Sequence, residues 1–171
     1  MYKIVVMAVL LVLTACGDAR NPKNNTEKNI YRSADKMLLA FRNKDWETFM
    51  TYLHPNMIAR LGGKDQMARL MTAQMKDVPD SAIKKLMVSR ILQVKETPTD
   101  VQCIVEQQMM MHLQGAEVTS TTYLVGESLD HGKNWTFFDA SNSGVASPGT
   151  IKPNLSPELK IPEKKQDARE L

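Results

Sequence analysis

Side chains that could carry out acid–base chemistry are few in this sequence and lie far apart along the chain. Enzymatic proton transfer needs a carboxylate or a histidine whose pKa is shifted by burial, next to a polar partner. The candidates are His54 or Asp139 as the base and Arg90 as the electrostatic partner, with Gln107 as a further polar group. A nucleophile with a base and a third orienting group cannot be assembled. The residues therefore favour proton transfer over nucleophilic catalysis, if the protein is an enzyme.

Three of these candidates share a strand face with apolar residues. The neighbours on those faces are Leu86, Val88, Leu92 and Val94 for Arg90, Val105 and Met109 for Gln107, and Trp135 and Phe137 for Asp139. If the faces line a cavity, the three are polar groups in an apolar pocket. Alternatively they lie near a sheet edge, or Arg90 and Asp139 form a structural ion pair. His54 precedes a proline at a helix end, where a structural role beside the helix dipole is the alternative to catalysis.

The sequence predicts no metal site, no cofactor and no nucleic-acid partner. The three histidines are scattered, and the two cysteines have no zinc-ligand spacing. Cys103 lies among apolar residues, so we expect a buried structural thiol. The net charge of +3 falls to +2 if Lys3 is removed with a leader, and the charges are dispersed, which argues against binding to nucleic acid.

The elements that must position these residues change in character along the chain. Apolar residues recur at helical spacing from Ile30 to Phe41, around Phe49, and from Met67 to Met75. From Ile83 the period changes to two, and strands are expected up to Phe138 with turns between them. Helices followed by an antiparallel meander predict an α+β fold. A curved sheet wrapped around the helices would form a cone with a cavity inside.

Composition divides the chain into four parts. Residues 1–15 are predicted as a signal peptide, 16–29 as a flexible polar tether, 30–145 as the α+β domain, and 146–171 as an extended or disordered tail. The tail prediction rests on Pro148, Pro153, Pro157 and Pro162, followed by interleaved basic and acidic residues.

The N-terminus carries a motif that indicates where in the cell the protein is located. Lys3 and an apolar run from Ile4 to Val12 precede Leu13-Thr14-Ala15-Cys16, which resembles the lipobox of bacterial lipoproteins. The resemblance implies that Cys16 is acylated, becomes the first residue of the mature chain and anchors the protein to a lipid bilayer. Gly17 rather than aspartate follows, which by the same resemblance favours the outer membrane of a bacterial cell envelope. The alternative is an ordinary signal peptide with a chance cysteine.

The order of elements resembles the nuclear-transport-factor-2-like (cystatin-like, SnoaL-like) superfamily over roughly residues 29–140. The matching stretches are Asn43-Lys44-Asp45-Trp46, Tyr52-Leu53-His54-Pro55, and Asp130-His131-Gly132-Lys133-Asn134-Trp135. The resemblance implies a cone-shaped fold, in which homodimers through the sheet face are also expected. The superfamily holds enzymes and non-catalytic members, so the fold alone implies no activity.

Methionine content bears on what the interior could bind. Met109-Met110-Met111 and the helical Met67, Met71 and Met75 suit an adaptable apolar surface, although ordinary core filling is the alternative. We therefore expect a membrane-anchored, non-catalytic module that binds a small apolar ligand or a protein partner. The alternative is a small envelope enzyme that transfers protons in the cone pocket. A third option is a structural lipoprotein with a filled interior.

Overall fold

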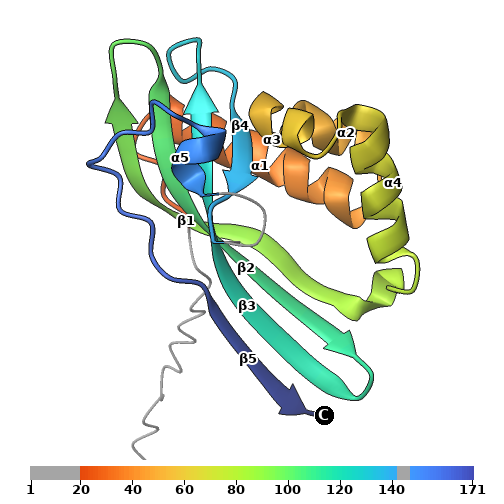
Figure 1. Cartoon of the computed structure of the whole chain (residues 1–171). Helices are drawn as coiled ribbons and strands as arrows, with labels where there is room; N and C mark the ends of the chain where they lie inside the picture. Colours follow the sequence, from red (N-terminus) through yellow and green to blue (C-terminus); the bar gives the residue numbers. More distant parts are fainter. Residues whose placement is uncertain (1–19, 142–146) are drawn as a thin grey trace, which may run out of the picture.

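The computed structural model describes residues 20–141 and 147–171 (Figure 1). Its elements in chain order are α1 (Asn25–Arg42), α2 (Trp46–Thr51), α3 (Pro55–Arg60), α4 (Lys64–Met75), the 3-10 turn η1 (Asp80–Ala82), β1 (Ile83–Glu96), β2 (Val101–Leu113), β3 (Ala116–Ser128), β4 (Thr136–Asp139), α5 (Pro148–Ile151) and β5 (Lys165–Glu170). The prediction of an α+β fold with helices first and an antiparallel sheet afterwards is confirmed.

Helices α1 and α2 begin at capping residues that the sequence supplies. The side chain of Asn24 accepts a hydrogen bond from the Glu27 amide at the start of α1, and Asp45 does the same for Thr48 at the start of α2. Helix α1 therefore starts five residues before Ile30, inside the predicted tether. Arg20 also contacts this helix, through a salt bridge of 2.7 Å to Asp35. The described end of the predicted tether is thus attached to the domain.

The sheet has the order β1-β2-β3-β4, with every pairing antiparallel. Strand β3 is longer than β4, and β5 pairs with the part of β3 that β4 leaves uncovered. Figure 1 shows α1 to α4 on one side of the sheet and the C-terminal segment with α5 on the other. We call these two sides the helix face, which includes Val105, Leu124 and Phe137, and the outer face, which includes Ile104 and Val125.

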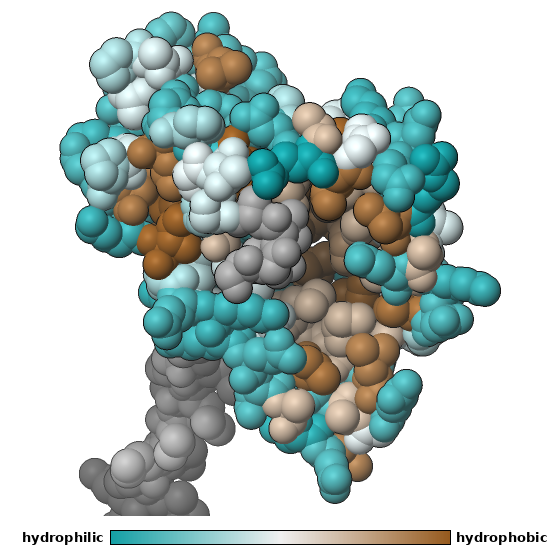
Figure 2. All heavy atoms as spheres, viewed as in Figure 1, coloured by the Kyte–Doolittle hydropathy of each residue, from teal (hydrophilic) through white to brown (hydrophobic). Residues whose placement is uncertain are grey.

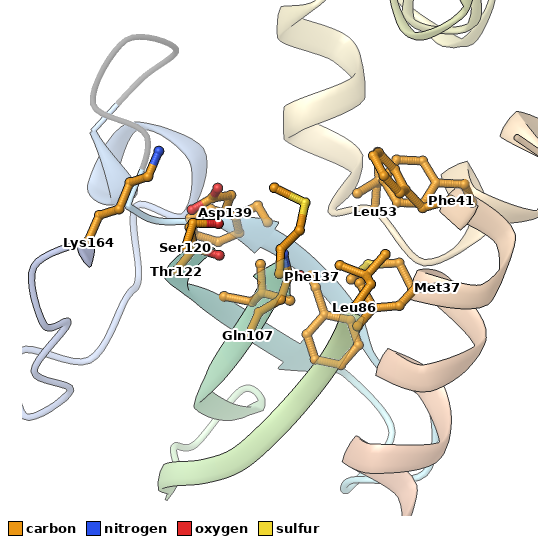
Figure 3. A pocket seen from close by; sticks show the side chains of 15 residues that line it. Met37, Phe41, Leu53, Leu86, Gln107, Ser120, Thr122, Phe137, Asp139 and Lys164 are labelled. Atoms are coloured by element: carbon orange, nitrogen blue, oxygen red, sulfur yellow. The ribbon is translucent and has the colours of Figure 1, made fainter. Parts of the chain in front are cut away.

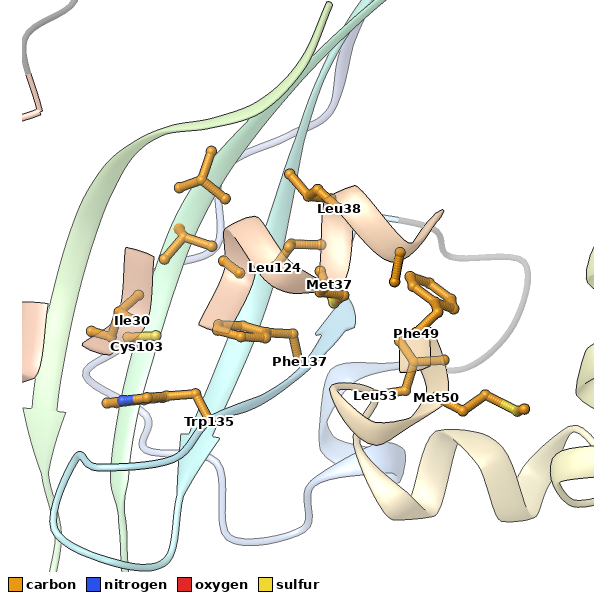
Figure 4. Packing of buried hydrophobic residues seen from close by; sticks show 14 of the residues in the cluster. Ile30, Met37, Leu38, Phe49, Met50, Leu53, Cys103, Leu124, Trp135 and Phe137 are labelled. Carbon is orange, nitrogen blue, oxygen red and sulfur yellow. The ribbon is translucent and has the colours of Figure 1, made fainter. Parts of the chain in front are cut away.

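Each face of the sheet has its own apolar core. On the helix face, Ile30 and Met37 of α1 and Phe49 of α2 pack against Cys103 and Phe137 (Figure 4). The close approach of β3 to this core depends on Gly126, where an added Cβ would lie 2.6 Å from the Cys103 sulfur. The outer-face core packs against two residues of the C-terminal segment, Ile151 and Leu159.

The prediction that residues 146–171 form an extended or disordered tail is wrong for the part that packs into the domain. Ile151 and Lys152 are almost completely buried and Leu159 is buried, whereas residues 165–170 are extended, as an exposed strand. The prolines interrupt regular structure, as expected, but they do not prevent apolar side chains between them from packing on the sheet.

Candidate functional site

A cavity of about 270 Å³ lies between the helix face of the sheet and helices α1 and α2 (Figure 3). Its lining residues are mainly apolar: Met37, Leu38, Phe41, Phe49, Leu53, Leu86, Met109, Leu124, Phe137 and Phe138, with Gln107, Ser120, Thr122, Asp139 and Lys164 as the polar members. Figure 2 shows the apolar side chains in a hollow between the helices and the sheet. We call this space the helix-face cavity.

An adjoining hollow of about 370 Å³ continues between β4 and helices α2, α3 and α4. It shares Phe41, Phe49, Leu53, Phe138 and Asp139 with the helix-face cavity. The helical side adds Met57, Leu61, Met67, Leu70 and Met71, together with Gln74. Met67 and Met71 were expected in the interior, and they line this methionine-rich extension. Flexible thioether side chains let such a surface adapt to ligands of different shape.

The polar members of the lining gather on one side of the helix-face cavity. In Figure 3, Asp139, Ser120, Thr122 and Lys164 lie on the side opposite Phe41 of α1 and Leu53 of the α2–α3 connection. Asp139 Oδ1 accepts a hydrogen bond of 2.8 Å from the Ser141 amide. Among the residues that line either hollow, Asp139 is the one carboxylate. The cavity is therefore polar on one side and apolar on the other.

Thr122 has an unusual environment within this polar group. Its side chain is buried, and within the described ranges its hydroxyl has no hydrogen-bond partner. Leaving a buried hydroxyl unpaired costs about 1–3 kcal/mol. Such groups are uncommon in folded proteins, and a ligand that supplies the missing partner is one physical reason for them.

Two of the four candidates from the sequence line the helix-face cavity, namely Gln107 and Asp139. Lys164 lines it too, although the sequence placed this residue in an extended or disordered tail. Nothing in the residue type or sequence spacing of Lys164 indicated a place in the site, because its location depends on where the C-terminal segment packs.

Arg90 does not point into the helix-face cavity, contrary to the expectation from strand alternation. Its guanidinium forms an ion pair of 2.8 Å with Glu106, which neighbours Val105 and Gln107 in β2 and so points to the outer face. The reason is an irregularity in β1: Val88 pairs with Gln107, but Arg90 pairs with Glu106, so one extra residue interrupts the alternation. The alternative of an Arg90–Asp139 ion pair is not observed either, since the carboxylate beside Arg90 is Glu106.

His54 is buried and belongs to a different cluster. Its Nδ1 accepts from the Asn56 amide at 3.2 Å, and its Nε2 lies 2.9 Å from Glu127 Oε2. Both ring nitrogens are therefore engaged within the protein. The imidazole acts as the N-cap of α3 and also packs edge-on against Phe138. These contacts support a structural role for His54 rather than a catalytic one, although the role is that of the α3 N-cap and not that of a residue at a helix C-terminus beside the dipole.

Glu127 connects His54 to a buried ionic cluster that the sequence did not reveal. The Lys152 ammonium donates to Glu127 Oε1, to Asp100 Oδ2 at 2.5 Å and to Asn154 Oδ1 at 3.0 Å. The side chains of Lys152 and Asp100 are 1% and 0% exposed. Lys152 comes from the C-terminal segment, Asp100 from the β1–β2 turn and Glu127 from β3. The cluster thus attaches this segment to the sheet.

The electrostatics of the cluster keep its carboxylates charged. Burial would raise the pKa of Asp100, but hydrogen bonds from Lys152, Thr97 and Gln102 lower it to about 2. For Glu127, the hydrogen bond from His54 lowers the pKa, burial opposes this, and Lys152 lowers it further. Because every member is paired, the cluster is suited to holding structure in place rather than to exchanging protons.

Several further expectations concern metals, thiols and membranes. Among residues 20–141 and 147–171, no group of His, Cys, Asp and Glu is arranged to hold a metal ion. Within the same ranges, no helix has the length and apolar character needed to cross a bilayer. Cys103 is buried as expected, and burial raises the pKa of its thiol far above the usual range. Cys16 lies outside the described residues.

Comparisons with known proteins add no assignment to this geometry. A scan against protein-family models gave no match to the chain, and a search of the curated proteins also gave none.

Proposed function

We propose that the protein is an exported lipoprotein whose α+β domain is a non-catalytic module that binds a small apolar ligand in the helix-face cavity. In this proposal acylated Cys16 anchors the chain to a bacterial envelope membrane, with the outer membrane favoured. The order of helices and antiparallel strands supports assignment of the domain to the nuclear-transport-factor-2-like cones.

The observation that carries the proposal is the apolar lining of the helix-face cavity and its extension. Ligand sites are typically concave and mostly apolar, with a small number of polar groups that orient the ligand. The helix-face cavity has this composition. Its apolar walls come from α1, α2 and the sheet, and its polar groups are Gln107, Ser120, Thr122, Asp139 and Lys164.

The proton-transfer alternative finds less support. It required Arg90 as the electrostatic partner of Asp139 or His54. Arg90 is instead held by Glu106 on the outer face, and His54 is held by Asn56 and Glu127. Asp139 remains in the cavity without the electrostatic partner proposed for it.

Binding of an uncharged apolar dye, N-phenylnaphthylamine, tests the proposed site. We expect dye fluorescence to rise with the wild-type chain and to be largely lost in Met109→Trp, because the indole fills the cavity. Met110→Trp is the matched control: the residue is also half-buried in β2, but its side chain points to the opposite face. Circular dichroism verifies that both variants fold. No dye binding by the wild type, or equal loss in both variants, would refute the site.

The anchor is tested separately from the cavity. The Cys16→Ser variant is expected to carry no acyl chains and to move from the membrane to the soluble fraction, since the acyl chains supply the membrane affinity. Mass spectrometry of the intact protein and membrane fractionation measure both effects. Unchanged fractionation, together with a wild-type mass that shows no acylation, would contradict the proposed anchor.

A further inference from the structure

The helix-face cavity and its extension have a chemical polarity that restricts the ligand beyond the statement that it is apolar. The polar groups Gln107, Thr122 and Asp139 are on the sheet, and Met37 and Phe41 of α1, with Leu53 between α2 and α3, form the opposite wall (Figure 3). The methionine-rich extension continues from Phe41 and Leu53 toward α4. A ligand that fills both spaces must be polar at one end and apolar along the rest of its length.

The hydrogen-bonding groups at the polar end are incompletely used. Within residues 20–141 and 147–171, the Thr122 hydroxyl has no partner, and the hydrogen bonds of Asp139 involve only its Oδ1. A carboxylate oxygen can only accept, whereas a hydroxyl can donate and accept. A head group that fits these atoms therefore carries at least one O–H or N–H donor for Asp139 and an oxygen acceptor for Thr122.

The charge of Asp139 further restricts which head groups the cavity can bind. A carboxylate or phosphate at this end would lie beside the Asp139 carboxylate, and like charges in a partly dehydrated cavity repel strongly. Lys164 also lines the cavity, but it is solvent-exposed, and water and salt screen an exposed charge. The lining thus disfavours anionic heads and accepts uncharged ones.

We propose that the helix-face cavity binds single-chain amphiphiles with an uncharged, hydroxyl-bearing head, the chemical class of the monoacylglycerols. The head hydrogen-bonds to Asp139, Thr122 and Gln107, and the acyl chain lies along Phe41 and Leu53 into the methionine-rich extension. This inference rests on the proposed binding function and specifies its ligand class.

Displacement of bound N-phenylnaphthylamine by three laurate derivatives tests the ligand class in the full chain. Monolauroylglycerol has the uncharged hydroxyl head, methyl laurate lacks the hydroxyl donors, and laurate carries a negative charge. Each is used below its critical micelle concentration at neutral pH. We expect monolauroylglycerol to bind about tenfold more tightly than methyl laurate, as loss of one hydrogen bond to a charged group implies, and about tenfold more tightly than laurate, because Asp139 repels the charged head.

Two variants connect the preference to the named residues. Asp139→Asn is expected to strengthen laurate binding about tenfold, because the repelling charge is removed. Thr122→Val is expected to raise the melting temperature of the free protein, because an unpaired hydroxyl is removed, and to weaken monolauroylglycerol binding. Thr121→Val, at the neighbouring position on the opposite strand face, is the matched control and should leave that affinity unchanged.

The outcomes separate this inference from the proposed function. Dye binding with equal displacement by all three amphiphiles, or tighter binding of laurate, refutes the ligand class and leaves the cavity as a binding site. An unchanged affinity for monolauroylglycerol in Thr122→Val also refutes it. If the dye does not bind at all, the proposed function and the ligand class both fail.

Discussion

At the scale of single residues, the most consequential side chain is Lys152. It is almost completely buried and lies between two carboxylates, Asp100 and Glu127. Taking charges out of water costs several kcal/mol per ion, so each member of such a cluster depends on the others. Asn154 and His54 complete the hydrogen bonding around the three charges. Removal of the Lys152 ammonium would leave two buried carboxylates without a neighbouring positive charge to balance them.

We therefore predict that Lys152→Met lowers the free energy of unfolding by about 3–5 kcal/mol near neutral pH, as found when one partner of a buried ion pair is removed. Urea denaturation followed by tryptophan fluorescence measures the change. Lys160→Met is the control, because Lys160 is exposed in the same segment and should change stability by less than about 0.5 kcal/mol.

The pH dependence of this variant provides a second check. The folded pKa of Asp100 is about 2, below its usual value of 3.8, so its contribution to stability is present above pH 3.8 and is lost as pH falls toward 2. In Lys152→Met the main cause of that lowering is gone. The stability gap between the two proteins should therefore narrow as the pH decreases through this window, and a constant gap would contradict the assignment.

At the scale of elements, the sheet depends on places where strand backbones approach side chains closely. In β3, an added Cβ at Gly126 would lie 2.6 Å from Cys103 Sγ and 2.8 Å from the Phe137 ring. These neighbours belong to the helix-face core, which also holds α1 against the sheet. In β1, an extra residue changes which face each side chain occupies and moves Arg90 to the outer face. Both features are local: the first lets β3 pack closely on the core, and the second keeps Arg90 out of the cavity lining.

Gly126→Ala is expected to destabilise the fold by about 1–3 kcal/mol, because a methyl group must be accommodated in a core that has no room for it. Gly149→Ala is the matched control, since an added Cβ there meets nothing within 4 Å. Thermal denaturation monitored by circular dichroism compares the two. Equal melting temperatures for both variants would show that the Gly126 contact is relaxed at little cost.

At the scale of the whole molecule, the C-terminal segment is the element that closes the outer face of the sheet. Ile151 and Leu159 cover Ile104, Val125 and Phe138, and the exposed strand β5 pairs with the part of β3 that β4 leaves uncovered. The domain is therefore larger than the part that ends near residue 145. Removing this segment would uncover an apolar face and break the cluster of Lys152.

A chain that ends at residue 141 is accordingly expected to be strongly destabilised or insoluble, whereas one that ends at residue 162 should still unfold cooperatively. The first lacks Lys152, Ile151 and Leu159, and the second lacks only the strand β5 and the residues beside it. Soluble yield and urea denaturation of both truncated chains measure the difference. Similar midpoints for the two would mean that the outer-face core contributes little.

The sequence by itself determined the α+β class, the order of the helices and strands up to β4, and the buried state of Cys103, because capping residues and apolar periodicity act over a few neighbouring positions. It also indicated Gln107 and Asp139, whose strand faces follow simple alternation. Only the tertiary structure decided the position of Arg90, because one extra residue in β1 reverses the faces. The same holds for the cluster of Lys152 with Asp100 and Glu127, since long-range packing of a proline-rich segment leaves no periodic signal.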